Sequence, residues 1–139
     1  MDLLERARTL AACALFENLA PAVLIRLAER ARAVELVRGE RRTTDDTVWV
    51  VASGALAVAV RETTADATAS IVRQRGAGAE PGQALGVIRV VRPETPAVEV
   101  VAMQPSVVVG LAVDDVRDVL EEDPAALTAL ADGQAARRL

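Results

Sequence analysis

The chain has 139 residues, of which 52% are hydrophobic and 26% charged, and its net charge is −4. This length fits one compact domain, and charges scattered through the apolar runs argue against both a disordered chain and a membrane span. The acidic excess disfavours nucleic acid as a partner, because binding to phosphates depends on clustered cations. With no His and one Cys, an imidazole base, a His-ligated zinc site and an internal disulfide are excluded within one chain.

Residues 1–33 are expected to be helical. Apolar side chains recur there at spacings of three and four, which predicts two amphipathic helices, with Asn18 or Ala20 as cap and Pro21 in the first turn of the second. Cys13 lies in an alanine-rich run and is expected to be a small buried hydrophobe. The acidic residues Asp2 and Glu5 lie where a signal peptide would have basic or apolar residues, so the sequence predicts a cytoplasmic location.

Short valine-rich segments, separated by Gly, Asp and Pro, predict an antiparallel β-roll over residues 34–113. The predicted strands are 34–37, 47–52, 56–60, 69–74, 97–103 and 107–113. Turns are expected at residues 38–40 (RGE) and at Ser53-Gly54, which is predicted to close a hairpin. Residues 76–83 contain three Gly and one Pro, a composition that predicts a loop.

Helical spacing returns over residues 114–139, where Asp123 is expected to cap a helix that starts at Pro124. The whole chain, residues 1–139, is therefore predicted to be a single domain of helices, a β-roll and further helices. Nothing after the last predicted strand suggests a DNA-binding domain. The acidic run 121–123 is expected to be a helix end and cap rather than a metal site.

Several short motifs, taken in order along nearly the whole chain, point to one family. They are residues 15–19 (LFENL), 38–40 (RGE), 48–58 (VWVVASGALAV), 81–83 (PGQ) and 113–116 (VDDV). Together they resemble the cyclic nucleotide-binding domain superfamily. The resemblance implies a mainly β fold, a double-stranded β-helix or jelly roll, with helices at both ends. It also implies a regulatory domain without enzymatic activity.

The ligand site of that superfamily follows the Pro-Gly turn as a Gly-Glu pair, a short helix, and an Arg before a small hydroxyl residue. The Arg and the helix N-terminus hold the cyclic phosphate, and the Glu accepts the ribose 2′-OH. Gapless alignment from Pro81 keeps the Gly as Gly86 but places Val87, Pro96 and Ala97 at the Glu, Arg and hydroxyl positions. Losing the phosphate partner costs about 3–5 kcal/mol, so the resemblance implies a scaffold with lost or altered nucleotide binding and no cofactor.

A working sensor for cyclic AMP or cyclic GMP is the alternative. Its phosphate site would combine backbone groups of this segment with Arg89 or Arg92, which otherwise are the solvated face of a short helix. The candidate ligand-binding residues are Gly82, Gly86, Val87, Arg89, Arg92, Pro96 and Ala97. No catalytic or metal-binding constellation is predicted, since Ser53 has no His to activate it. An enzyme would need a cofactor or a second chain to supply the missing base.

Two further expectations concern packing and partners. The stretch from Glu40 to Trp49 is shorter than the superfamily's usual strand-turn-strand, so the first hairpin is predicted to be truncated. Trp49 is expected to pack in the core rather than stack on a ligand. The terminal amphipathic helices are the expected contacts with a protein partner or with the rest of a longer parent chain, and the C-terminal helix is a candidate homodimer seam.

Overall fold

The computed structural model describes residues 1–13, 16–63, 70–79, 81–86, 90, 94, 96–126 and 128. Two helices open the chain as predicted, α1 (Leu3–Ala12) and α2 (Pro21–Arg30). The Asp2 carboxylate caps α1 by accepting the Glu5 N–H at 2.8 Å, whereas α2 follows Ala20 and begins with proline at its first position. No helix in the described ranges is both long and apolar enough to cross a membrane.

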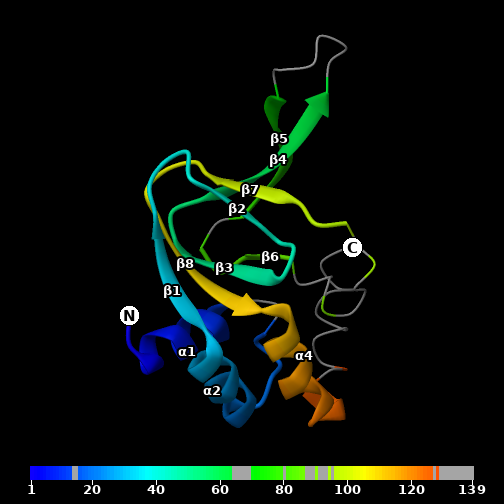
Figure 1. Ribbon diagram of the computed structural model, residues 1–139. Coiled ribbons are helices and arrows are strands. Elements are labelled where there is room, and N and C mark those ends of the chain that lie inside the picture. Colours follow the sequence, from blue (N-terminus) through cyan, green and yellow to red (C-terminus); the bar gives the residue numbers. More distant parts are fainter. Residues whose placement is uncertain are drawn as a thin grey trace.

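Antiparallel strands form the body of the molecule, as predicted (Figure 1). They are β1 (Arg32–Leu36), β2 (Arg41–Thr43), β3 (Thr47–Ser53), β4 (Leu56–Thr63), β5 (Ser70–Ala79), β6 (Ala84–Leu85), β7 (Glu99–Ala102) and β8 (Ser106–Ala112). Among the described residues they pair into two four-stranded sheets, in the orders β1-β8-β3-β6 and β2-β7-β4-β5. Helix α4 (Val113–Glu121) follows β8 directly.

The turn at Ser53-Gly54 corrects one prediction. Gly54 has φ +89°, as a tight turn requires, but β3 and β4 belong to different sheets, so the turn passes the chain from one sheet to the other instead of closing a hairpin. Strand β3 pairs with β8 and β6, while β4 pairs with β5 and β7. The alternation of side chains is the same in both arrangements, so it does not reveal which strand is the neighbour.

The glycine-rich stretch 76–83 corrects a second prediction, because its first four residues belong to β5 rather than to a loop. Gly78 pairs with Ala57 and Ala79 with Leu56, and a register shift interrupts the ladder between Ala57 and Ala59. Backbone pairing needs no side chain, and glycine is common beside such irregularities. The predicted turn is confirmed further on, at Pro81–Gly82.

Two apolar clusters hold the layers together. One lies between the helices and the outward face of the β1-β8-β3-β6 sheet and contains Cys13, which is fully buried as predicted. The other lies between the two sheets and is formed by Leu36, Trp49, Val51, Leu56, Val100, Ala102 and Val108. Figure 1 shows α1, α2 and α4 gathered on one side of the roll, with the β4–β5 hairpin projecting from the opposite side.

Candidate functional site

The Pro-Gly turn stands at the start of β6, where the sequence placed it. Gly82 has φ +86°, and its N–H donates to the carbonyl oxygen of Val51 at 3.1 Å. The Val51 N–H in turn donates to the carbonyl oxygen of Gln83 at 2.9 Å. These two bonds prolong the pairing of β3 with β6, so the Gly82 N–H already has an acceptor within the chain.

Gly86 lies at the other end of β6 and is covered by a threonine from a distant part of the sequence. Its φ is +92°, and a Cβ added there would lie 3.1 Å from Thr44 Cβ and 3.1 Å from the Thr47 carbonyl oxygen. Thr44 is only 1% exposed. Both the backbone conformation at position 86 and the close approach of Thr44 therefore favour glycine there.

Thr44 also binds the segment that precedes β7. Its Oγ1 accepts the Val98 N–H at 2.9 Å, and its own N–H donates to the Val98 carbonyl oxygen at 2.9 Å. The sequence did not single out Thr44, because its partner is 54 residues away. The one sequence feature that pointed to this region was the short stretch between Glu40 and Trp49, which predicted a truncated first hairpin. Strand β2 is indeed only three residues long.

The remaining predicted ligand residues divide into two groups. Pro96 and Ala97 are exposed just before β7. Val87, Arg89 and Arg92 lie outside the described residues. The structure thus places Gly82 and Gly86 at the two ends of β6.

Among the described residues, apolar side chains pack between the two sheets. Every member of the cluster between the sheets is at most 5% exposed. Trp49 lies over the neighbouring strand, where a Cβ on Gly110 would be 2.8 Å from its Cζ3, and its Nε1–H donates to the Thr43 carbonyl oxygen at 2.8 Å. The indole thus packs in the core, as predicted, with its polar edge satisfied.

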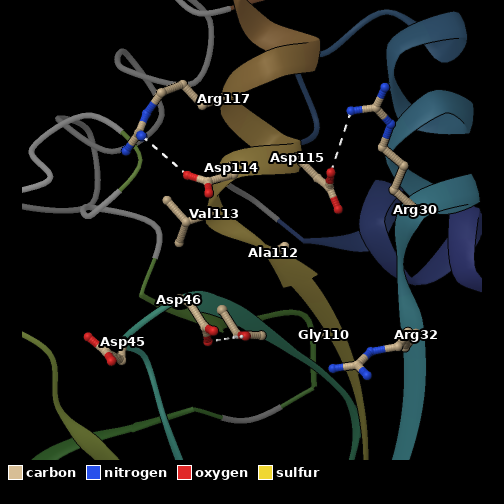
Figure 2. Close-up of a pocket in the computed structure, with 11 residues that line it drawn as sticks. Arg30, Arg32, Asp45, Asp46, Gly110, Ala112, Val113, Asp114, Asp115 and Arg117 are labelled. Carbon is tan, nitrogen blue, oxygen red and sulfur yellow. Dashed lines mark hydrogen bonds and ion pairs between the residues drawn. The ribbon is translucent and has the colours of Figure 1, made fainter.

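A cavity of about 610 Å³ opens elsewhere, between the end of α2, the β2–β3 connection and the first turn of α4 (Figure 2). Of the predicted ligand residues, the four that the structure describes, Gly82, Gly86, Pro96 and Ala97, do not line it. Its charged side chains are Arg30, Arg32, Arg117, Asp45, Asp46, Asp114 and Asp115. Arg30 pairs with Asp115 at 3.7 Å and Arg117 with Asp114 at 3.5 Å. Among the described lining residues, three cations stand against four carboxylates, so this set of side chains does not select an anion by charge.

Solved structures of known proteins share this architecture. The sensor domain of the transcriptional regulator DNR from Pseudomonas aeruginosa matches with a TM-score of 0.73 and 17% identity, over 97% of this chain and 89% of that one. The regulatory domain of Toxoplasma gondii PKA, co-crystallised with cAMP, matches at 0.66 and 14%, over 88% and 49%. The regulatory subunit of a cAMP-independent protein kinase A from Trypanosoma brucei matches at 0.62 and 17%, over 86% and 47%.

This chain has the fold of the cyclic nucleotide-binding domains. At identities of 14–17% the similarity concerns the fold, and it confirms the jelly roll with flanking helices that the motifs implied. No protein-family model matches the sequence, and no curated protein matches it either. The chain spans about half the length of the two kinase regulatory chains.

Proposed function

We propose that this chain is a non-enzymatic regulatory domain of the cyclic nucleotide-binding fold in which nucleotide binding is lost or altered. The observation that carries the proposal is the contact of Thr44 with Val98 and Gly86. The buried hydroxyl of Thr44 accepts the backbone N–H of Val98, which lies in the segment that aligns with the phosphate cassette. The Gly82 N–H is also taken, by Val51, so two donors of this segment already have acceptors within the chain.

The free-energy cost of admitting a nucleotide follows from these contacts. A phosphate oxygen that replaced Thr44 Oγ1 at Val98 would exchange one hydrogen bond for another and leave the buried hydroxyl with only its longer bond, 3.4 Å, to the Val98 carbonyl oxygen. A buried polar group that loses a partner costs up to about 1–3 kcal/mol, which would weaken binding by at most roughly 150-fold. That loss adds to the loss expected from Val87, Pro96 and Ala97, which offer no carboxylate, guanidinium or hydroxyl.

The matched structures are compatible with this proposal. One of them holds cAMP and another belongs to a kinase described as cAMP-independent, so the fold by itself does not decide for or against a nucleotide. The DNR match is the sensor domain of a larger regulator, and the kinase matches are longer chains. We therefore propose that this domain acts in the cytoplasm through contacts with a protein partner or with the remainder of a parent chain.

Isothermal titration of the purified chain with cyclic AMP, cyclic GMP and cyclic di-GMP, each near millimolar concentration, tests the loss of binding. We expect no saturable heat from any of the three. Saturable heat that Arg89→Ala or Arg92→Ala removes would contradict the loss and support the working-sensor alternative. It would also identify which arginine pairs with the phosphate.

A further inference from the structure

The charged cavity of Figure 2 contains one arginine that stands apart from its ion pairs. Arg30 is paired with Asp115 and Arg117 with Asp114, so these four side chains neutralise one another. Arg32 lines the cavity from β1, and within the described part of the chain its guanidinium makes no ion pair or hydrogen bond. The wall formed by β1 therefore presents a positive charge that no described residue balances.

The opposite wall, formed by the connection between β2 and β3, carries negative charge. Asp46 is fixed there by two bonds, since its carbonyl oxygen accepts the Val113 N–H at 2.8 Å and its Oδ1 accepts the Thr47 hydroxyl at 2.9 Å. Its Oδ2 has no hydrogen-bond partner among the described residues. Asp45 lines the same wall with a second carboxylate. This wall can therefore accept hydrogen bonds from a positively charged group.

Strand β8 forms the floor between these two walls, and a glycine keeps the floor open. Gly110 pairs with Arg32 of β1 on one side and with Trp49 of β3 on the other. A Cβ at Gly110 would lie 2.8 Å from the Trp49 Cζ3, so the indole fits only against glycine. Figure 2 shows the Arg32 guanidinium turned toward Gly110, with Asp46 on the other side of that strand. Neighbouring strands are ~4.8 Å apart, so the two walls leave roughly 10 Å for one small molecule.

We propose that this cavity binds a free α-amino acid with an apolar side chain, its carboxylate on Arg32 and its ammonium group on Asp46. A guanidinium binds a carboxylate through two parallel hydrogen bonds, and hydrogen bonds between charged groups are the strong ones. Ala112 and Val113 add apolar side chains to the lining, and a cavity of about 610 Å³ has the size of a small-molecule site. A simple anion would meet Asp46 and a simple cation would meet Arg32, so a zwitterion suits both walls.

Isothermal titration of the full 139-residue chain with L-leucine, L-methionine and L-alanine, each raised to millimolar concentration, tests the proposal. We expect saturable heat from at least one of them. For leucine, the matched analogues are leucinamide, which lacks the carboxylate, and isocaproate, which lacks the ammonium group. Each should bind roughly tenfold more weakly than leucine, because it leaves one wall unpaired. Trp49 is the single tryptophan of the chain and lies against Gly110, so its fluorescence gives a second signal of binding at this cavity.

Arg32→Gln and Asp46→Asn should each weaken the binding roughly tenfold. Both side chains are exposed, and asparagine keeps the backbone carbonyl that accepts from Val113 and a side-chain oxygen for Thr47, so we expect both variants to fold. Arg38→Gln removes an exposed arginine from the turn after β1, outside the cavity lining, and should leave the affinity unchanged.

Absence of saturable heat from all three amino acids overturns the proposal. So does binding that Arg32→Gln and Asp46→Asn leave unchanged, because the amino acid would then be held elsewhere. The inference goes beyond the proposed function and does not depend on it, since the predicted nucleotide residues that the structure describes do not line this cavity.

Discussion

Two glycines with nearly the same backbone conformation differ in what surrounds them. Gly39 has φ +88° and Gly54 has φ +89°. A Cβ on Gly39 would meet nothing within 4 Å, whereas one on Gly54 would lie 2.7 Å from the Ser106 Cα and closer still to its side chain. Ser106 is buried, and its Oγ accepts the Ala55 N–H and donates to the Gln104 carbonyl oxygen. These hydrogen bonds leave the Ser106 side chain little room to move away from a Cβ added at Gly54.

Substituting each of these glycines by alanine separates backbone strain from steric overlap. Gly39→Ala should lower the free energy of unfolding by about 1 kcal/mol, the cost of a left-handed conformation with a Cβ. Gly54→Ala should lower it by about 2–4 kcal/mol, because overlap with Ser106 is added to the same strain. Urea denaturation measures both, and equal losses in the two variants would contradict this account.

At the candidate site, the sequence predicts the residues whose own backbone conformation shapes the chain. It does not predict the residue that matters because it contacts a segment far away in the sequence. The turn at Gly82 and the position of Gly86 followed from local sequence signals. Thr44 carries no such signal, because a threonine beside two aspartates suits a turn in many folds. Its partners, Gly86 and Val98, reach it only when β2 and β3 have joined different sheets.

Among the elements, length and periodicity decided what the sequence could predict. The helices α1 and α2 and the longer strands repeat their apolar residues often enough to be recognised. Strands β2 and β6 contain three and two residues, too few for a period, and their existence is set by pairing with β7 and β3. Pairing likewise extended β5 through glycines that local propensity assigns to a loop.

The docking of α4 on α2 shows which interaction dominates between helices. Ion pairs join Arg26 to Glu122 and Arg30 to Asp115 and Asp118, but both arginine side chains are about 40% exposed. Exposed pairs contribute little, since solvent screens them. The apolar face of α4, which includes Val119 and Leu120, is by contrast almost completely buried.

We therefore expect the double substitution Arg26→Gln and Arg30→Gln to lower the free energy of unfolding by less than about 1 kcal/mol. Leu120→Ala should lower it by about 2–5 kcal/mol, because it removes buried methyl groups and leaves a cavity. Urea denaturation at low and at high salt distinguishes the two effects, since the ion-pair contribution fades with salt. A larger loss in the arginine variant than in Leu120→Ala would reverse this ranking.

At the scale of the whole molecule, the buried face of α4 limits where the chain could associate with a second copy. Val116, Val119 and Leu120 pack within the chain itself, so α4 has no apolar stripe left for a partner. A homodimer seam at the C-terminal end must therefore depend on residues after Glu122, where the sequence repeats Leu127 and Leu130 at helical spacing. The N-terminal helices offer a second surface, with Leu4 and Ile25 exposed.

Removal of residues 123–139 should therefore abolish concentration-dependent self-association in sedimentation velocity runs, while the full chain shifts to faster sedimentation as its concentration rises. Leu130→Glu keeps the chain length and should have the same effect, because a charge in an apolar seam opposes its burial. Circular dichroism of both variants controls for unfolding, which matters since the truncation also removes Ala126, a buried residue. If truncated and full chains sediment alike at every concentration, the seam does not lie in this segment. The exposed Leu4 and Ile25 would then be the side chains to substitute, because they are apolar helix residues that the fold leaves uncovered.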